Sequence, residues 1–582
     1  MNYRLPLIYS GLLLIRIMSI TLQSIFFVFQ TLKITFHIPG SSMGSNRDST
    51  PSKKMGITIY FAFFAVALGA VATVLLYRGI YPNIRGDGHS YFELSQHIFQ
   101  GEFYRTNQWR QFEYSQPYGV TYPPLWPIII AAFNKIFEAG LSAGLFINCL
   151  LSIATLFVLL RLGAKVFSLP IFGFALYCAL AGNHEYWGEV ANSGSIPLQV
   201  LMLSSIFYVY FSHATFGLRH IIIMGTIAGL MMLNRNDSML LALLLGVAVL
   251  KYANLRKWQA GVVYYASLGL INLPWWVHNM RIFGRPLVSE NSHLILYAKR
   301  IDNHDFFINK PPTVFEQPVT WMHKFFDNSM LELQITGKEL ISDPTLMCLI
   351  VILFATYRMH SRNNNSISSP INETTRQYIL YNSRKAVWLA PVFIGQLAVI
   401  ILASFLANRY YIPIKFYLVL LLLLALLGIC RDGCKEYSNK ASYIVTGVAF
   451  LFILIINYSI IHNAGGIKAT WFLLNEDRMV WQKSRFKEIE QCMGNEKFSS
   501  KLFILDNQVA DSIELTALTG IASVEMPYNL TIDYVDFLEP LIRRFAVTHV
   551  VVSKNQYLNE INKSYQLKKI CALPIYKLLP RS

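Results

Sequence analysis

Five polar clusters interrupt an otherwise apolar chain, and each one directly follows an apolar segment. Carboxylates and arginines recur in these clusters, together with histidine and tyrosine. A carboxylate can remove a proton from an attacking hydroxyl, and the planar guanidinium of arginine can hold phosphate oxygens through two hydrogen bonds. Such a set suits the transfer of a group away from a phosphate, because the acceptor needs a base and the departing phosphate needs cations. The candidate residues are Arg85, Asp87, Tyr91, Glu185, Glu189, Arg235, Asp237, His278, Arg281, Arg409 and Tyr410.

The composition indicates a membrane protein. Of the 582 residues, 54% are hydrophobic and 14% are charged, whereas about a quarter of the residues in a soluble domain are charged. The 50 Lys and Arg exceed the 33 Asp and Glu, which gives a net charge of +17. Basic cytosolic loops between membrane helices explain this excess. The composition therefore excludes an ordinary cytosolic enzyme and a disordered chain, and it gives no reason to expect a nucleic-acid partner.

The apolar segments predict an all-α, polytopic membrane domain. A membrane helix needs about 20 mostly apolar residues, and somewhat shorter helices fit a tightly packed bundle. We expect about 11 to 13 such helices. The segment 117–138 opens with prolines and contains Asn134 and Lys135, so we expect a surface-parallel or partly inserted helix there. The predicted membrane helices are 55–79, 141–160, 166–182, 196–211, 218–233, 238–250, 259–277, 343–357, 386–406, 412–430 and 441–461.

The charges between these segments predict the orientation of the chain. If 117–138 does not cross, the loops that alternate onto the cytosolic side are all basic, as expected for cytosolic loops. A crossing at 117–138 would reverse this assignment, unless another membrane helix were also missed. The polar clusters then emerge together on the non-cytosolic face, which also carries the long outer loops 80–122 and 278–342. The basic loops are 161–165, 212–220, 251–257, 358–385 and 431–440.

Three parts of the chain differ in character. Residues 1–54 form an N-terminal extension with an apolar stretch and a polar linker, which could be an extra membrane helix, a signal-like segment or a region upstream of the true start. Residues 55–461 hold the membrane domain. Residues 462–582 alternate strand-like and helix-like pieces, from KLFILD to THVVVS, and predict a small α/β domain outside the membrane.

The seven cysteines lie mostly within or beside apolar runs, as expected for residues packed in the core. Cys430 and Cys434 form a C-x-x-x-C without a second pair. The sequence therefore predicts neither a zinc site nor a disulfide framework. His184, Glu185 and Glu189 do not form a helical ligand set such as H-E-x-x-H. Whether the protein requires a divalent ion stays open.

Taken in order, the motifs of the chain resemble those of the GT-C superfamily of integral membrane glycosyltransferases. The motifs are D-x-x-x-Y, YPPLWP, LNRND, PWWVHNMRIFGRP and NRYYIP, and they lie within residues 55–430. The likeness is greatest to the branch of protein O-mannosyltransferases and aminoarabinose transferases. It implies inverting transfer of a sugar from a polyprenyl- or dolichyl-phosphate donor to a glycan, lipid or protein acceptor on the non-cytosolic face. The membrane would be a bacterial inner membrane or a plasma membrane.

The resemblance also implies roles for individual residues. Asp87 matches the essential aspartate of the family's first outer loop, with the role of a base or of a group that positions the acceptor, and Tyr91 matches the aromatic residue one turn later. Arg235 and Asp237 match an R-P-D-like pattern in which Asn236 replaces the proline.

At the later motifs the match is less complete. His278 stands where the family usually has an arginine, and Arg281 could substitute for that arginine. Arg409, followed by Tyr410, matches an R-Y-x-x-P pattern with a role at the lipid phosphate.

Simpler interpretations stay open for several of these residues. Asp87 could cap a helix, Arg235 and Asp237 could form an ion pair in a tight turn, and Arg409 could be an interfacial cation. Glu185 and Glu189 could be solvated loop residues, and we expect solvation for Glu93 and Glu102 and headgroup anchoring for Trp126, Trp275 and Trp276. A secondary transporter and a non-catalytic lipid-binding assembly subunit are the alternative functions.

Overall fold

The computed structural model describes the larger part of the membrane domain and of the C-terminal domain. The described residues are 87–100, 103–109, 122–167, 184–287, 381–403, 411–433, 476–496, 499–505, 512–525 and 538–581, with a few helical positions at 173–180 and 318–329. The N-terminal extension 1–54 and the predicted membrane helices 55–79, 343–357 and 441–461 lie outside the described residues.

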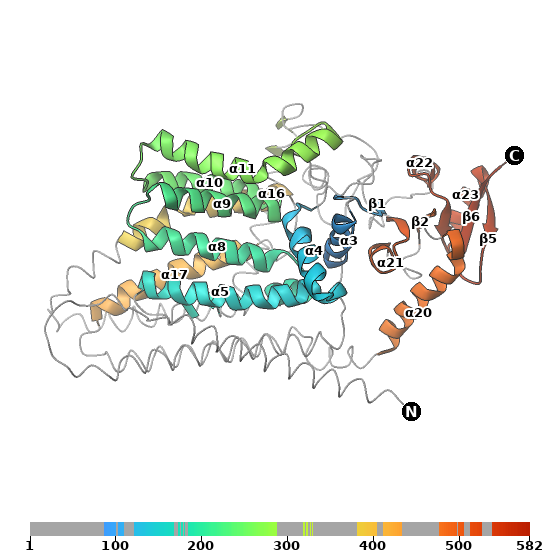
Figure 1. Ribbon diagram of the computed structural model, residues 1–582, viewed down its shortest axis with the longest axis horizontal. Coiled ribbons are helices and arrows are strands. Elements are labelled where there is room, and N and C mark those ends of the chain that lie inside the picture. Colours follow the sequence, from blue (N-terminus) through green and yellow to red (C-terminus); the bar gives the residue numbers. More distant parts are fainter. Residues whose placement is uncertain are drawn as a thin grey trace. The chain divides into compact units, whose positions relative to one another are not determined.

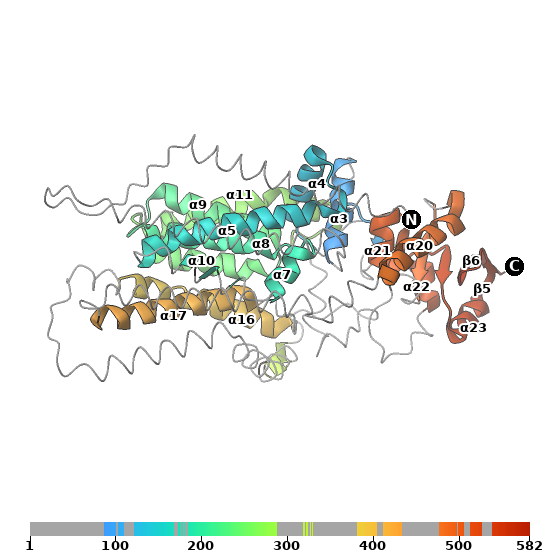
Figure 2. The same ribbon diagram turned by 90° about the horizontal axis from the view of Figure 1, so that it is seen from below.

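Long apolar helices form a bundle in which they run roughly side by side (Figures 1 and 2). Each of them coincides with a predicted membrane helix to within a few residues. The longest are α5 and α11, and α11 continues past its predicted end through PWWVHNMRIF. The helices are α5 (Ala143–Phe167), α8 (Ile196–Ser212), α9 (Leu218–Asn234), α10 (Ser238–Lys251), α11 (Lys257–Phe283), α16 (Ala390–Ala403) and α17 (Ile412–Gly433).

The described helices differ in length and in apolar character. Within the described residues, the stretch Gly140–Val166 is long and apolar enough to cross a bilayer by itself. Several apolar helices are shorter, among them α8, α9 and α10. The total number of crossings therefore stays a prediction of the sequence.

Small residues allow α9 and α11 to pack closely. Gly225 and Gly229 lie one turn apart on α9, and they face the backbone of α11. A Cβ atom at Gly225 would lie 2.6 Å from the carbonyl oxygen of Tyr264, and one at Gly229 would lie 3.0 Å from that of Leu268. Only glycine permits this approach, which is a common way to bring two helices together in a membrane.

Two short helices cover one end of the bundle. α3 (Asp87–Phe99) and α4 (Leu125–Phe137) lie there together (Figures 1 and 2). α4 is the expected short helix of segment 117–138, and Pro124 stands at its N-cap, where the missing N–H group costs nothing. After the 3-10 helix η1 (Gly140–Ser142) the chain enters α5, and α7 (His184–Ala191) precedes α8.

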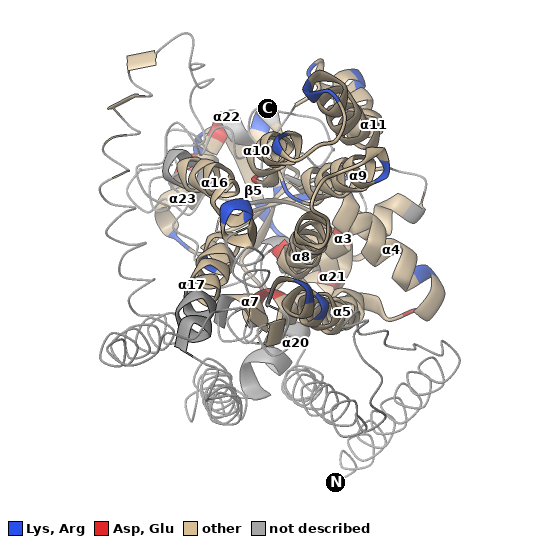
Figure 3. Ribbon diagram, turned by 90° about the vertical axis from the view of Figure 1, so that its left-hand side faces the viewer, with Lys and Arg blue, Asp and Glu red and all other residues tan. Residues whose placement is uncertain are grey.

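The opposite end of the bundle is basic. Figure 3 looks onto this end and shows Lys and Arg on α5, α9 and α11. Backbone hydrogen bonds join the loops here, since Phe216 N–H donates to Tyr252 and Asn254 N–H donates back to Phe216. The predicted loops 212–220 and 251–257 therefore lie at one end of the bundle. The prediction of a loop at 161–165 is wrong, because α5 continues as a helix to Phe167.

A buried lysine closes this basic end. Lys385, in the helical segment 381–387, is 0% exposed. Its ammonium donates to the carbonyl oxygens of Tyr210, at 2.7 Å, and of His213. Four aromatic rings surround it, with centroids 4.7–5.2 Å from Nζ, which are those of Tyr210, Phe216, Tyr252 and Tyr381. We call this arrangement the lysine cage.

The C-terminal part contains the predicted α/β domain. Its sheet has the order β1-β3-β2-β4-β6-β5, in which the first four strands are parallel and β6 and β5 are antiparallel. Apolar side chains such as Phe503, Val524 and Val550 form its core. The elements are α20 (Glu476–Met493), η3 (Gly494–Glu496), β2 (Lys501–Ile504), α21 (Ser512–Thr519), β3 (Ala522–Glu525), α22 (Leu538–Arg544), β4 (His549–Val551), α23 (Asn555–Ser564), β5 (Tyr565–Lys569) and β6 (Ile575–Pro580).

The edge strand of this sheet comes from elsewhere in the sequence. β1 (Gln108–Trp109) belongs to the first outer loop, directly after α3, and it pairs in parallel with β3. Ser523 N–H also donates to the carbonyl oxygen of Asn107, at 3.1 Å. The first outer loop is therefore part of the C-terminal sheet, which the sequence did not predict.

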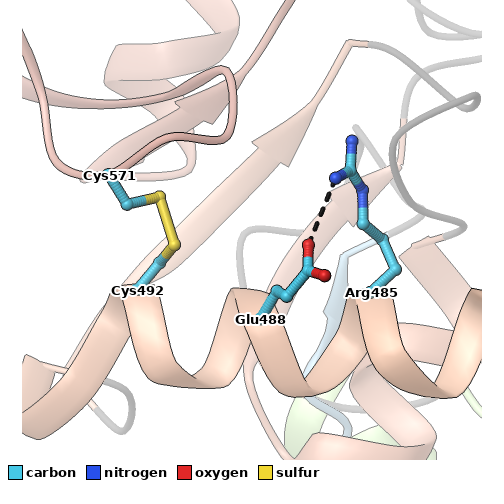
Figure 4. Close-up of a disulfide and its surroundings, with 4 residues drawn as sticks. All are labelled: Arg485, Glu488, Cys492 and Cys571. Atoms are coloured by element: carbon cyan, nitrogen blue, oxygen red, sulfur yellow. Dashed lines mark hydrogen bonds and ion pairs between the residues drawn. A yellow bond between two sulfur atoms is a disulfide. The ribbon is translucent and has the colours of Figure 1, made fainter.

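A disulfide fastens the C-terminal domain. Cys492, near the end of α20, is bonded to Cys571 in the connection between β5 and β6, with the two Cα atoms 5.7 Å apart (Figure 4). Figure 4 also shows the ion pair between Arg485 and Glu488 on α20. The prediction that the cysteines form no disulfide is wrong for this pair, because residues 79 positions apart carry no local pairing signal.

Candidate active site

Asp87 is the first residue of α3, at the end of the bundle opposite the lysine cage. The phenol of Tyr122 donates to Asp87 Oδ1 at 2.7 Å, and the side chain of Asp87 is only partly buried. The Tyr122 ring packs on that of Tyr91, with centroids 4.5 Å apart. The N-terminus of a helix favours a negative charge. The structure therefore holds a carboxylate at a fixed position while part of it stays accessible.

A hydroxyl links α3 to the bundle. Tyr91 lies one turn after Asp87, and its OH lies 3.1 Å from Ser195 Oγ. Arg235 Nη1 donates to the same Ser195 oxygen at 3.2 Å. Asn234 also donates to the Ser195 carbonyl at 2.9 Å. Ser195 thus joins the helix that begins at Asp87 to the turn that carries Arg235, and sequence reasoning did not select it.

Arg235 and Asp237 form a two-pronged ion pair. Arg235 Nε lies 2.9 Å from Asp237 Oδ1, and Nη2 lies 3.4 Å from Oδ2. Arg235 is 8% exposed, so its charge depends on these partners. The ion pair that the sequence left open is present, and the same guanidinium also binds Ser195.

The first turns of α8 and α10 lack a capping hydrogen bond from the N-cap side chain. Ser195 is the N-cap of α8 and Asp237 is the N-cap of α10, yet neither side chain makes a capping hydrogen bond. Serine and aspartate at this position usually stabilise a helix by about 1 kcal/mol through such a bond. Both side chains bind Arg235 instead. The side chains at the starts of α8 and α10 are therefore used to hold Arg235.

Glu189 lies on α7 beside the turn that leads into α8. It is 8% exposed, so the solvated reading of this residue is wrong. A Cβ atom at Gly194 would lie 1.9 Å from Glu189 Oε2, so the carboxylate occupies the space that the glycine leaves at this turn. Asn148 Nδ2 donates to the Gly194 carbonyl at 2.9 Å. Glu185 lies on the same helix, but its side chain is outside the described residues.

The charges of Asp87, Glu189 and Arg235 all act on Tyr91. Burial is the main cause that raises the pKa of Tyr91 above its ordinary value, and the negative charges of Asp87 and Glu189 raise it further. The positive charge of Arg235 and the hydrogen bond from Ser195 lower it. Tyr91 is therefore a neutral phenol, and the charges of two carboxylates and one guanidinium act on it.

His278 lies in an aromatic environment near the end of α11. Its ring stacks on Trp275 with centroids 5.2 Å apart, and Phe103 meets it edge-on at 5.2 Å. Tyr104 also contacts Trp275, and it donates to the carbonyl oxygen of Tyr122, whose phenol binds Asp87. His278 is thus joined to the site through rings rather than charges. Arg281, less than one turn later, is exposed.

Several sequence-based expectations fall outside the description or need correction. Arg85, Glu102, Arg409 and Tyr410 lie outside the described residues. Trp126 is 0% exposed and donates to the Ser193 carbonyl at 2.8 Å, so it is a core residue rather than a headgroup anchor. Among the described residues, no group of three or more His, Cys, Asp or Glu side chains could hold a metal ion.

Glu93 was expected to be solvated and is not. It is 2% exposed, on α3. Its Oε1 accepts from Asn107 N–H at 2.5 Å, and its Oε2 accepts from Thr106 Oγ1 at 2.9 Å. His97 Nε2 lies 3.3 Å from Oε1. The contacts to Thr106 and Asn107 come from a loop more than a dozen positions away, so the helix sequence alone gives no sign of them.

The fold was compared with known proteins. No protein-family model and no curated protein matches the sequence. Among solved structures, ArnT from Cupriavidus metallidurans bound to undecaprenyl phosphate superposes with a TM-score of 0.50 at 13% identity, over 90% of this chain and 98% of that chain. The chain has the fold of ArnT.

The ArnT likeness confirms the fold that the motifs predict. It covers both the membrane domain and the C-terminal part, since almost the whole of ArnT is matched. The archaeal oligosaccharyltransferase AglB from Archaeoglobus fulgidus, in complex with an inhibitory peptide and a dolichol-phosphate, is also similar, with a TM-score of 0.42 at 12% identity over 90% of this chain and 74% of that chain.

Proposed function

We propose that the chain is a membrane glycosyltransferase that moves a sugar from a polyprenyl- or dolichyl-phosphate donor to an acceptor. The observation that carries this proposal is the position of Asp87, an accessible carboxylate held by Tyr122 and linked through Tyr91 and Ser195 to Arg235. The ArnT fold supports it, because ArnT was solved with undecaprenyl phosphate bound. The acceptor class stays open between a glycan, a lipid and a protein.

In the proposed reaction Asp87 removes the proton from an acceptor hydroxyl. The hydroxyl oxygen bonds to the anomeric carbon while the bond from that carbon to the phosphate oxygen breaks, through an oxocarbenium-like state. The electron pair of the broken bond stays on the phosphate, which leaves as polyprenyl or dolichyl phosphate. Tyr122 fixes one oxygen of Asp87 and so sets the direction in which the carboxylate can accept a proton.

The arginines take two different roles in this scheme. Arg235 directs three of its N–H groups to Asp237 and Ser195, so we assign it to positioning the site. Arg281, which is exposed near the end of α11, and Arg409 are the candidates to bind the leaving phosphate. His278 lies on α11 near Arg281, within an aromatic wall that suits the lipid or the sugar.

The disulfide supports a location of the C-terminal domain on the non-cytosolic face. Disulfides persist in oxidising compartments and are rare in the cytosol. The bond between Cys492 and Cys571 therefore agrees with the orientation predicted from the basic loops. The periplasmic or extracellular side of a bacterial inner membrane or a plasma membrane is the compartment that we propose for the site.

A deletion experiment tests the proposed function. Mass spectrometry of envelope glycans, lipids and proteins compares cells that lack the gene with cells that regain either the natural chain or Asp87→Asn. We expect one glycoform to disappear with the gene and to return only with the natural chain. A transporter or an assembly subunit has no need of this carboxylate, so full restoration by Asp87→Asn would remove the enzymatic proposal.

A further inference from the structure

The buried carboxylate of Glu93 has no part in the proposed chemistry, yet it lies on the helix that begins with Asp87. On a helix of 3.6 residues per turn, Asp87 and Tyr91 share one face of α3. Glu93 and His97 lie on a different face, roughly 120° around the helix. Removing a carboxylate from water is costly unless hydrogen bonds replace the water. Glu93 finds these bonds in the segment that follows α3.

The segment that Glu93 holds is the start of strand β1. Asn107 donates its backbone N–H to Glu93, and it presents its carbonyl oxygen to Ser523 in the C-terminal sheet. The next residues, Gln108 and Trp109, are the register partners of Ser523 and Val524. The N–H group of Asn107 is thus bound to α3, and its carbonyl group is bound to β3. Helix α21 of the same domain also contacts α3.

Packing at Tyr104 also holds the connection between α3 and β1. Tyr104 has φ = 64°, a left-handed conformation that is rare for a residue with a bulky side chain. It is 0% exposed, and it packs with Leu94 and Trp275 in one core cluster. The unusual backbone persists because packing on both sides determines it. In residues 103–107, the described stretch that leads into β1, the backbone is therefore held both by packing at Tyr104 and by the hydrogen bond at Asn107.

We propose that Glu93 is a positioning residue, which fastens β1 to α3 so that the C-terminal sheet and the helix of Asp87 form one body. The C-terminal domain then belongs to the catalytic apparatus, and any acceptor bound by that domain is presented at a fixed distance from Asp87. This inference rests on the proposed function for its effect on catalysis, but its structural half is independent of the reaction.

A cross-link tests the structural half in the full-length protein. Gln108→Cys combined with Ser523→Cys places cysteines at register partners of two adjacent strands, where Cα separations of about 5 Å suit a disulfide. We expect mild oxidation to produce this bond, identified by mass spectrometry of unreduced peptides, without loss of sugar transfer. Absence of the bond under conditions that preserve the natural disulfide would overturn the proposal.

A second variant tests the catalytic half. In Glu93→Gln the charge is lost while an oxygen remains. The matched control is Glu488→Gln, whose exposed carboxylate contacts only Arg485 and Ser484 on its own helix among the described contacts. We expect a fall in kcat of about tenfold or more with the KM for the lipid donor within about twofold, and faster hydrogen exchange at Asn107. The control should change neither.

The outcomes separate this inference from the proposed function. If kcat and exchange at Asn107 are both unchanged in Glu93→Gln, the positioning role is wrong. If Asp87→Asn retains full transfer while the cross-link still forms, the proposed function fails and the link between β1 and α3 stands. A lower melting temperature of Glu93→Gln with an unchanged kcat would also contradict the positioning role, because it would make Glu93 a purely structural residue.

Discussion

Helices α8 and α9 have two chemically different ends. At the start of α8 and the end of α9, Ser195 and Arg235 bind one another and reach Tyr91 of α3. At the other end, where the turn 213–217 joins the two helices, the lysine cage surrounds Lys385. Both ends therefore hold a buried cation, but the two cations have different surroundings.

The difference lies in what each cation binds and in how far the end is open. Lys385 has backbone carbonyls and ring faces as partners, and it is 0% exposed. Arg235 binds a carboxylate and a hydroxyl, and that hydroxyl contacts Tyr91 on the helix that begins with the partly exposed Asp87. The contacts of Lys385 are to carbonyls and aromatic rings at one end of the bundle, so we expect it to stabilise the fold. A cation joined to titratable groups at an open helix end can shape chemistry, and the comparison therefore separates structure from function within one helix pair.

The largest effect should follow from a change at the open end. Arg235→Lys keeps the charge but cannot make the paired contacts to Asp237 and the contact to Ser195 at once. We expect sugar transfer to fall by about 100-fold, because a misplacement of about 1 Å near a reacting group has this effect. Arg219→Lys, an exposed position near the start of α9, is the control and should transfer at the natural rate. Equal rates in the two variants would show that the ends do not differ.

A change in the lysine cage should act on stability alone. Lys385→Met leaves the carbonyls of Tyr210 and His213 without their donor, at a cost of about 2 kcal/mol. The melting temperature should fall, while kcat per folded molecule should not change. Lys257→Met is the matched control, since the Lys257 ammonium also binds helix-end carbonyls, those of Leu250 and Lys251, but is exposed. A kcat that falls with Lys385→Met would break the division of roles.

The smallest effect concerns a single hydroxyl. Ser195→Ala removes the oxygen between Tyr91 and Arg235, and we expect transfer to fall about fivefold, as for the loss of about 1 kcal/mol of hydrogen bonding. Ser205→Ala on the same helix removes only a bond to the Leu201 carbonyl one turn back. Kinetic measurements should find the control within error of the natural chain. Indistinguishable variants would show that the hydroxyl does not couple α3 to the bundle.

The helices of the bundle could be predicted from the sequence because their boundaries are local. Residues 218–233 were expected to be helical, and α9 ends at Asn234, since an apolar run bounded by Gly217 and the LNRND turn needs no distant information. The pieces of the C-terminal sheet were likewise predictable one by one. The participation of β1 in that sheet was not, because a strand of two residues has no pattern of its own.

Within the site, the sequence revealed the residues but not their connections. Charged residues after apolar segments drew attention to Asp87 and Arg235, since charge at a membrane surface needs an explanation. Ser195 is an ordinary N-cap type, and Glu93 has the spacing of a solvated helix residue. Their importance arises from contacts across about 40 and 14 positions of the chain, and such contacts leave no trace in a single sequence.

Release of the lipid phosphate tests the central claim most directly. The purified protein in liposomes is given synthetic undecaprenyl-phosphate hexoses and pentoses together with envelope extract as acceptor, and free undecaprenyl phosphate is measured over time. We predict release by the natural chain from one of these donors, and a rate about 100-fold or more lower with Asp87→Asn at an unchanged melting temperature. Equal release by Asp87→Asn and the natural chain would contradict the account.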